Sequence, residues 1–434
     1  MCRNIRELNL CAGSLMMNRA LKCEGRRDRK GDKAFLVAYN RKAISPLTNC
    51  TPDALGRKKR FKAHGGKSLI YYYTYLQKLK WERCKKLISG EEKLKKRPVV
   101  WNDSYIRDKY HPDEDCAHVS ETRFVHPPVS KEEKQLPIAF GLTIHRSARL
   151  FERILRAIYM PNNVYCIHVD KKSSSVFREA IQAIIRCLSN VFIAANSVDV
   201  TWGHITVVQA QFSCMEELLK STVKWKYYIN LVGQDFPLYD NKQIVRALHG
   251  LNNTNNIESF PVPNEFLGRT KFVHQLEARQ IYRTETQKGP PPHNISVYKG
   301  STFIIAIREF VEFVLRNQIG KDFYEFLRNA EVPDEAIYSS LQRHPQAPGG
   351  INGNQPKWIA RVLLWANEDT LDVCHGIWKR DVCWISLEDL RWVLGGREKK
   401  QLFVNKVPFD FSEELIECIL LARQGREYAT TVRK

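Results

Sequence analysis

Short apolar runs alternate with longer amphipathic segments between residues 136 and 232. Four runs of strand length are almost wholly apolar, at residues 136–144, 164–169, 191–195 and 227–232. The segments between them, at 150–159, 173–188 and 205–220, place apolar residues at the three- and four-residue spacing of one helix face. Strands and helices that alternate with this period predict parallel βαβ units, which assemble into a doubly wound α/β sheet.

The pattern continues more loosely toward the C-terminus and is missing before residue 136. Strands are predicted at 302–307, 360–365 and 401–404, and helices over 309–328 and from 333 onward. Residues 1–135 contain basic runs with little periodic apolar content, so we expect a solvated and partly disordered lead-in followed by a stem.

Composition adds one observation to this pattern, which is the uneven distribution of charged residues along the chain. Hydrophobic residues make up 43% of the 434 positions, which excludes global disorder. The formal net charge is +21, but residues 1–100 hold 26 Lys and Arg against 8 Asp and Glu, whereas the rest of the chain holds 42 against 39. Nucleic-acid binding would therefore fall to the basic lead-in, where no recognition motif is present.

The 12 cysteines form no Cys-x-x-Cys pair and no zinc-finger spacing, so they are either buried small side chains or disulfide partners. Four Asn-x-Ser/Thr sequons, at Asn49, Asn102, Asn252 and Asn294, favour an oxidising secretory compartment. The N-terminal region shows no apolar run near the ~7–15 residues of a signal peptide or the ~20 of a membrane span. Either the chain begins downstream of its natural start, or it does not enter the secretory route.

Candidate chemistry lies where predicted strands end, at His145, Asp170 and Gln234–Asp235. Neither a Gly-x-Gly-x-x-Gly fingerprint nor a P-loop is present, so a nucleotide would be held by its base and ribose. Asp170 suits a uracil or ribose contact, and it fits a turn or helix cap equally well. Glu335 follows Pro333 at a helix start, where an acidic residue can simply offset the helix dipole.

Five motifs together resemble one family, the core 2 / I-branching β-1,6-N-acetylglucosaminyltransferases. They are Leu-Arg-Ala-Ile-Tyr-Met-Pro at 155–161, Tyr-Cys-Ile-His-Val-Asp-Lys-Lys-Ser at 165–173, Gly-Gln-Asp-Phe-Pro at 233–237, Pro-Asp-Glu at 333–335 and Asn-Lys at 405–406. The resemblance covers about residues 49–418. It implies a Rossmann-like nucleotide-diphosphosugar transferase fold of the A type with a disulfide-tied N-terminal stem. It further implies inverting transfer of GlcNAc from UDP-GlcNAc to the 6-hydroxyl of a glycan acceptor, without a divalent metal or other cofactor.

The resemblance also implies an organisation and a location. We expect a basic segment at 1–48, a stem at 49–135, a nucleotide-sugar-binding half at 136–250, an acceptor-binding and catalytic half at 251–420 and a tail at 421–434. The family is anchored in the Golgi membrane as type II proteins with a lumenal catalytic domain, and that anchor is not visible in this sequence.

Residue roles come from the resemblance, position by position. Glu335 matches the catalytic base. The donor residues it implies are Asp170 for the uracil and Arg380 and Lys406 for the diphosphate; His145 and Trp202 are placed in the same pocket. Glu258, Arg269 and Trp365 match positions that line the acceptor site, although Trp365 would also fit a core position that closes a strand.

Eight cysteines match four disulfides of the family. The implied pairs are Cys50–Cys418, Cys116–Cys187, Cys166–Cys214 and Cys374–Cys383, which leaves Cys2, Cys11, Cys23 and Cys84 without assigned partners. The pair Cys374–Cys383 would stiffen the loop that carries Arg380.

Some positions depart from the family pattern. Val232 stands where the family has an unpaired cysteine, Asn367 and Trp202 stand where it has tyrosines, and the loop from Trp365 to Cys374 is shorter. These departures keep a second hypothesis open, a relative that binds nucleotide sugar or glycan without transferring the sugar.

Overall fold

A computed structural model describes residues 25–27, 33–35, 67–93, 102–351, 357–367, 370–395 and 400–431. The chain divides into two units, Met1–Lys78 and Leu79–Lys434. In the first unit, β1 (Gly25–Arg27) pairs antiparallel with β2 (Lys33–Phe35). Helix α2 (Lys67–Ser89) begins in the first unit. The sequon Asn49 and Cys50 lie outside the described residues.

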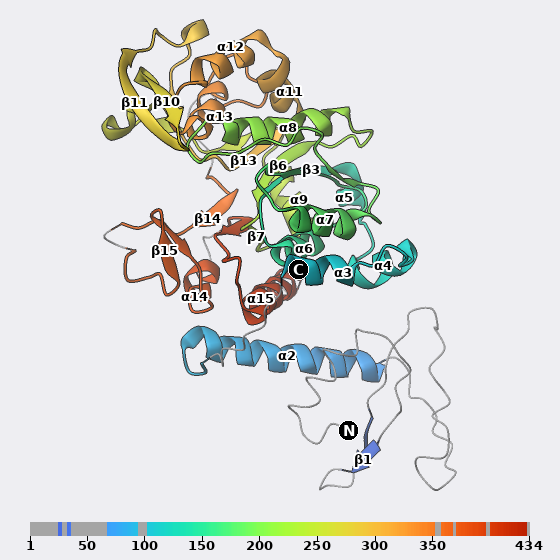
Figure 1. The fold of residues 1–434 in the computed structure, drawn as a ribbon. Coiled ribbons are helices and arrows are strands. Elements are labelled where there is room, and N and C mark those ends of the chain that lie inside the picture. Colours follow the sequence, from blue (N-terminus) through green and yellow to red (C-terminus); the bar gives the residue numbers. More distant parts are fainter. Residues whose placement is uncertain are drawn as a thin grey trace. The chain divides into compact units, whose positions relative to one another are not determined.

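A six-stranded sheet forms the centre of the second unit, in the order β5-β4-β3-β6-β13-β8 (Figure 1). Its parallel strands are β3 (Ile138–Ile144), β4 (Val164–Val169), β5 (Val191–Ile193) and β6 (Tyr227–Val232). Every residue of β4 is buried, as expected of a strand covered on both faces. These four strands confirm the predicted α/β sheet.

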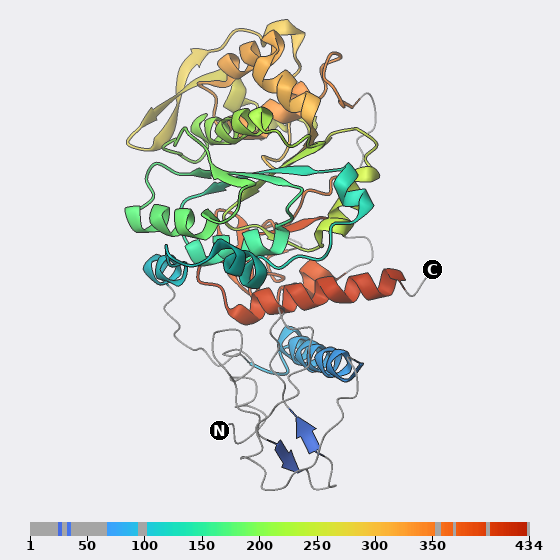
Figure 2. The ribbon, with the colours of Figure 1, turned by 90° about the vertical axis from the view of Figure 1, so that its right-hand side faces the viewer.

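Helices cover both faces of this sheet, with α8 on one side and α6 and α7 on the other (Figure 2). Their bounds are Ala148–Ile158 for α6, Ser175–Ile185 for α7, Thr206–Lys220 for α8 and Asn241–His249 for α9. Ser147 and Ser174 cap α6 and α7 directly behind the carboxyl ends of β3 and β4. The caps therefore turn the chain away just after His145 and Asp170, which leaves both residues at the sheet edge.

Strand β13 (Ile304–Ile307), predicted over 302–307, joins the same sheet and runs antiparallel to β6 and to β8 (Asn256–Ile257). Because β13 is antiparallel to β6, the chain enters β13 from the edge where β6 ends. Just before this entry, Gly300 N–H donates to the Glu335 carbonyl oxygen at 2.8 Å. A strand that starts at this edge has to run back across the sheet. Asn230 of β6 secures the entry through its bonds to Thr302 and Ile304.

The single helix predicted over 309–328 is wrong, because Asn317 divides it into α11 (Arg308–Arg316) and α12 (Gln318–Leu327). Asn317 has an extended backbone, and its side chain accepts from Ile319 N–H to cap α12. An asparagine side chain that caps a new helix in this way competes with continuation of the preceding helix.

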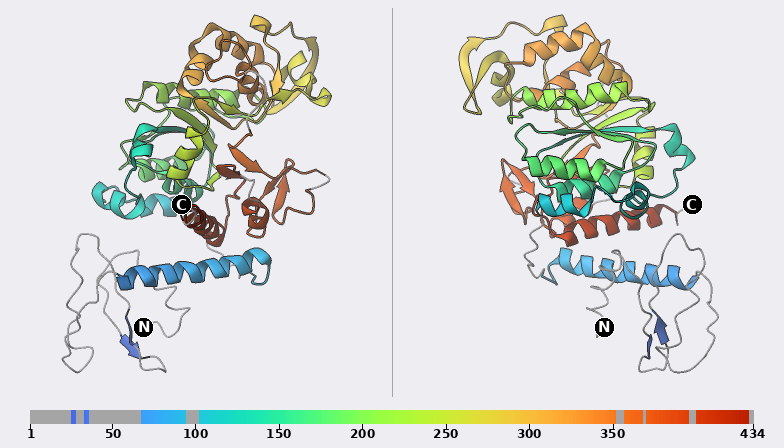
Figure 3. Two further views of the ribbon diagram at one scale, coloured as in Figure 1. Left: turned by 180° about the vertical axis from the view of Figure 1, so that it is seen from behind. Right: turned by 45° about the vertical axis from the view of Figure 1, so that its right-hand side comes forward.

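Small ladders surround the carboxyl edge of the sheet. Strand β17 (Phe403–Asn405) pairs parallel with β14 (Arg361–Leu363) and antiparallel with β7 (Phe236–Pro237). The other pairs are β9 (Phe260–Pro261) with β12 (Tyr298–Lys299), β10 (Phe272–Glu277) with β11 (Gln280–Gln287), and β15 (Ile377–Lys379) with β16 (Val382–Trp384). Figure 3 shows the β10–β11 hairpin at the border of the molecule.

Short helices and turns complete the unit. They are α3 (Asp103–Lys109), α4 (Cys116–Arg123), α5 (Lys131–Gln135), α10 (Gly268–Lys271), α13 (Ile337–Leu341), α14 (Leu390–Leu394), and the 3₁₀ turns η2 (Asn264–Phe266), η3 (Pro292–Asn294) and η4 (Pro333–Glu335). Helix α15 (Glu413–Thr431) follows as the last element. No helix in the described part of the chain has the combined length and apolarity of a membrane span. Asn102, Asn252 and Asn294 are exposed, as glycan acceptors have to be.

Two of the four implied disulfides are confirmed, Cys116–Cys187 and Cys374–Cys383. The pair Cys50–Cys418 is wrong, because Cys418 of α15 is bonded to Cys84 of α2. Cys84 lies on the buried face of α2 together with Leu87, so the helix presents it directly to α15. The ion pair of Lys80 with Glu417, at 2.6 Å, joins the same two helices.

The pair Cys166–Cys214 is also wrong, since both cysteines are free and buried. Their thiols form a hydrogen-bonded contact between β4 and α8, and burial raises the pKa of the Cys166 thiol. Both side chains act there as small apolar groups within the sheet–helix interface.

Non-reducing peptide mapping tests the corrected stem linkage. We expect a peptide in which Cys84 is joined to Cys418, and a free energy of unfolding about 2–4 kcal/mol lower in Cys84→Ser, because the bond closes a very long loop. In the Cys50→Ser control the Cys84–Cys418 peptide should persist. A peptide that joins Cys50 to Cys418 would contradict the assignment.

Candidate active site

Glu335, the predicted base, lies in η4 just after Val332, whose φ of 50° is left-handed. Two cations bind its carboxylate: Arg269 Nη1 donates to Oε2 at 3.0 Å, and Lys299 Nζ lies 3.1 Å from the same oxygen. Among the described residues we find no hydrogen-bond partner for Oε1. The carboxylate is thus fixed through one oxygen, while the other remains available to a substrate.

Glu258, Arg269 and Lys299 surround the base. Lys299 of β12 pairs with Phe260 of β9, two residues beyond Glu258, so a short ladder sets this spacing. Burial raises the pKa of Glu258, as does the nearby Glu335 charge, and Lys299 opposes them. The structure therefore brings together Glu335, Glu258 and Arg269.

A shallow, open hollow lies beside Glu335. Phe266 and Tyr298 supply apolar lining, and Arg269, Lys299 and Glu335 supply charge. Arg269 stacks over the Phe266 ring at 4.1 Å from its centroid. A hollow with aromatic faces and a few charged groups is suited to a sugar, whose ring has apolar faces and a rim of hydroxyls.

Asp334, next to the base, points into the protein interior. Burial and then the Glu335 charge raise the pKa of Asp334 to about 6, while a hydrogen bond with Thr302 opposes the shift. Of the two neighbouring carboxylates, only Glu335 reaches the hollow.

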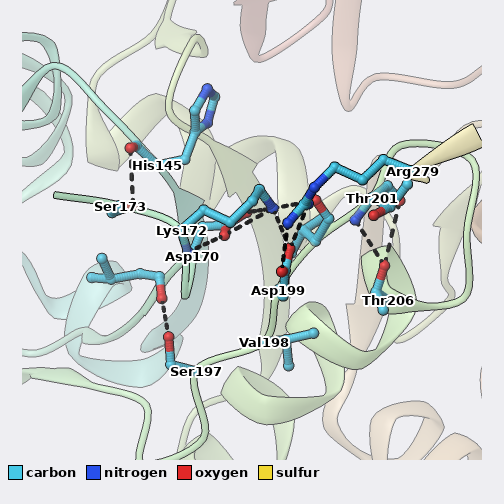
Figure 4. Close-up of polar contacts among 12 residues, drawn as sticks. His145, Asp170, Lys172, Ser173, Ser197, Val198, Asp199, Thr201, Thr206 and Arg279 are labelled. Atoms are coloured by element: carbon cyan, nitrogen blue, oxygen red, sulfur yellow. Dashed lines mark hydrogen bonds and ion pairs between the residues drawn. The ribbon is translucent and has the colours of Figure 1, made fainter.

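Asp170 lies at the end of β4 and is 6% exposed. Its carboxylate accepts from Lys172 N–H at 2.9 Å and lies 3.1 Å from Lys172 Nζ. The same Nζ contacts Asp199 at 2.7 Å, and Arg279 binds both oxygens of Asp199 at 2.9 Å (Figure 4). The Arg279 and Lys172 cations hold the pKa of Asp199 below its ordinary value. Both acidic groups at this end of the site are therefore paired with cations.

His145 belongs to the same region. Its carbonyl oxygen accepts from Ser173 Oγ at 2.9 Å, as Figure 4 shows, and the Asp170 amide donates to the Ile144 carbonyl at 2.9 Å. The His145 ring packs edge-on against Phe409.

Arg380, Lys406 and Trp202 come together at the other end of the site. The Arg380 guanidinium lies over the Trp202 ring, 5.1 Å from its centroid. Burial and then the Arg380 charge lower the pKa of Lys406, and Ile385 N–H, just after β16, donates to the Lys406 carbonyl oxygen at 3.0 Å. Arg380 occupies the two-residue turn of the β15–β16 hairpin, and the Cys374–Cys383 disulfide holds the base of that hairpin.

Trp365 is half exposed, which excludes the core position that the sequence left open. It forms a bridge with Val382, and Ala366 N–H donates to Asp381 at 2.8 Å. The structure thus places Trp365 beside the Arg380 turn, and no contact joins it to Glu258 or Arg269 among the described residues.

The loop that carries Trp202 connects these groups. Gly203 O accepts from Val332 N–H at 2.7 Å, three residues before Glu335, while Trp202 meets Arg380. Asp199 of the same loop pairs with Lys172, the neighbour of Asp170. One loop therefore contacts the Asp170 region, the Arg380 turn and the segment that leads to Glu335.

The Gly-Gln-Asp-Phe-Pro motif has a structural role in this site. Asp235 is fully buried and accepts four hydrogen bonds, two from Arg361 at 3.0 Å, one from Asn405 at 2.9 Å and one from Val232 N–H at 2.7 Å. Val407 N–H donates to the Gln234 carbonyl oxygen at 2.8 Å. The end of β6 thereby holds the backbone on both sides of Lys406.

Sequence analysis missed four charged residues, Lys172, Asp199, Arg279 and Lys299. Lys172 stands within a quoted motif, but the other three lie on loops and hairpins without a recognisable signal. Among the described residues, one group of potential metal ligands is close enough together to hold an ion. It consists of Cys374, Cys383 and Asp389, and its two cysteines are bonded to each other in a disulfide.

Comparison with known proteins gives a family and several relatives. The family profile described as Core-2/I-Branching enzyme matches residues 138–394. The chain is 34% identical over 410 residues to human beta-1,3-galactosyl-O-glycosyl-glycoprotein beta-1,6-N-acetylglucosaminyltransferase 3, covering 89% of this chain and 92% of that protein. The rat protein of that name is 34% identical over 409 residues, with the same coverage.

A relative of the same type from Bovine herpesvirus 4 is 32% identical over 413 residues, covering 89% of this chain and 92% of that protein. The solved structure of core-mannan synthase A from Aspergillus fumigatus is 13% identical, with a TM-score of 0.24 over 61% of this chain and 87% of that chain. That likeness is too small to bear on the fold.

Asp235→Asn tests the structural role of the buried carboxylate. We expect the free energy of unfolding to fall by about 3–5 kcal/mol, because Arg361 is left as an uncompensated buried charge. Urea unfolding followed by tryptophan fluorescence measures this change. The double variant Asp235→Leu/Arg361→Met should lose less stability than the single one, and an unchanged urea midpoint for Asp235→Asn would contradict the role.

Proposed function

Because the chain belongs to the core-2/I-branching enzyme family, we propose that it is an inverting β-1,6-N-acetylglucosaminyltransferase. It transfers GlcNAc from UDP-GlcNAc to the 6-hydroxyl of a glycan acceptor. The observation that carries this proposal is the Glu335 carboxylate, fixed through Oε2 by Arg269 and Lys299 and open at Oε1 beside a hollow.

The reaction needs one base. A sugar hydroxyl is a weak nucleophile, and Glu335 Oε1 accepts its proton as the oxygen attacks the anomeric carbon of GlcNAc. The bond from that carbon to the UDP oxygen breaks, and the electron pair leaves with UDP. A single displacement from the face opposite UDP inverts the anomeric configuration.

Fixed cations neutralise the leaving group in this proposal. Arg380 occupies the turn of the β15–β16 hairpin, and the Lys406 carbonyl oxygen accepts from Ile385 N–H, just after β16, at 3.0 Å. The two side chains present positive charge where the diphosphate gains negative charge. Burial first and the Arg380 charge second lower the pKa of Lys406, and a bound diphosphate would oppose both effects. No divalent metal is required in this mechanism.

The nucleotide base belongs at the other end of the donor pocket. Asp170 is buried at the end of β4, and the Lys172 contacts hold its carboxylate in place. A fixed carboxylate can accept a hydrogen bond from the uracil imide N–H, which gives selectivity for uridine nucleotides. Trp202, which is exposed, offers an aromatic face between the uracil and the diphosphate.

The acceptor binds in the hollow beside Glu335. Glu258 and Arg269 can bind sugar hydroxyls, and Phe266 and Tyr298 offer apolar faces. Trp365 lies beside the Arg380 turn, so we assign it to a more distant part of the acceptor.

We place the enzyme in the lumen of the Golgi apparatus. Three disulfides in the described residues and three exposed sequons favour an oxidising compartment in which glycans are added. The membrane attachment expected for the family belongs to the same proposal.

Glu335→Gln tests the mechanism. We expect the turnover of UDP-GlcNAc with core 1, core 3 and poly-N-acetyllactosamine acceptors to fall by about 10²–10⁴-fold, because the amide cannot accept the proton. UDP affinity, measured by calorimetry, should stay near the wild-type value. Turnover of the wild type should be unchanged in EDTA.

Glu325→Gln is the matched control, because Glu325 of α12 is exposed, pairs with Arg328 at 3.1 Å and does not line the hollow. It should retain turnover. Wild-type turnover in Glu335→Gln would remove the mechanism. UDP binding without transfer to any acceptor by the wild type would favour the non-catalytic relative instead.

A further inference from the structure

The β10–β11 hairpin carries an arginine that reaches the nucleotide end of the donor pocket. Its two strands are joined by the turn Ala278–Arg279. Arg279 binds Asp199 through both guanidinium NH2 groups, and Lys172 links Asp199 to Asp170, as Figure 4 shows. A bidentate arginine–carboxylate pair fixes orientation as well as charge.

The backbone of this turn points to a role for the side chain. Ala278 and Arg279 have φ values of 46° and 67°, in the left-handed region, where two-residue hairpins favour Asn-Gly. A residue with a side chain adopts this strained backbone conformation only where the surrounding structure holds it. Residues in such conformations are concentrated at active sites and ligand-binding sites. The β15–β16 hairpin has the same kind of turn, with Arg380 at φ 51° facing Trp202.

The hairpin meets the loop of residues 198–203 at a second point. A Cβ at Gly203 would lie 3.2 Å from Ile281 Cδ1, so β11 packs next to Trp202. At the other end of the hairpin, α10 carries Arg269, which binds Glu335 at 3.0 Å. The hairpin therefore extends from the neighbourhood of Glu335 to the end of the donor pocket where Asp170 lies.

We propose that Arg279 is a positioning residue for the nucleotide donor, acting through Asp199 on the loop of residues 198–203. By binding Asp199, Arg279 allows Lys172 to contact both Asp199 and Asp170, and it keeps Trp202 in place. Without Arg279, the Asp199 carboxylate draws Lys172 away from Asp170, and the contact surface for uracil is displaced. This inference rests on the proposed function, because it assumes that a uridine nucleotide occupies the pocket.

Arg279→Gly separates the role of the side chain from that of the backbone. We expect UDP binding by the full chain, measured by calorimetry, to weaken about fivefold, as the loss of a well-formed surface ion pair allows. The melting temperature should not fall, because glycine adopts the left-handed turn without strain. The KM for UDP-GlcNAc should rise by a similar factor while kcat stays within about twofold, and Arg279→Lys should restore part of the affinity.

Arg246→Ala is the matched control. Arg246 of α9 is 52% exposed, against 56% for Arg279, and pairs with Glu132 of α5 at 3.3 Å. It should bind UDP like the wild type. Wild-type affinity in Arg279→Gly overturns the inference, and so does a loss of affinity that only follows a lower melting temperature. Failure of the wild type to bind UDP would instead overturn the proposed function.

Discussion

The buried Asp235 carboxylate is the contact on which the site depends. It joins the end of a central strand to β14 through Arg361 and to β17 through Asn405, and both partners are buried with it. Because Asn405 immediately precedes Lys406, this contact sets where a key cation stands relative to the sheet. A charge held so deeply is costly to bury, and its four hydrogen bonds offset that cost.

The rest of the site follows from how loops meet at one edge of the sheet. Parallel strands bring Asp170 and His145 to this edge, and the hydrogen bond from Gly300 N–H, just before β13, to the Glu335 carbonyl oxygen ties Glu335 to it. Two hairpin turns each present an arginine to the loop around Trp202. Cationic side chains from segments far apart in the chain therefore gather at this edge.

The sequence predicted the parallel core well, because buried strands and amphipathic helices have strong periodic signals. It failed where a single residue decides the outcome, as when Asn317 divides a helix. The resemblance supplied Glu335, Arg269 and Arg380, whereas Lys299 and Arg279 lie on ladders whose register only the fold defines. Cys84 was missed because partner choice depends on which helix face is buried.

The central proposal is that two fixed cations hold the diphosphate of the donor, Lys406 positioned by the Asp235 contact and Arg380 by its disulfide-tied hairpin. A crystal structure of the protein with UDP, grown in EDTA, tests this claim most directly. The account predicts uracil against Asp170 and the diphosphate within hydrogen-bond distance of Arg380 and Lys406, with Glu335 Oε1 open toward the position of the sugar. A diphosphate bound away from both cations would contradict it.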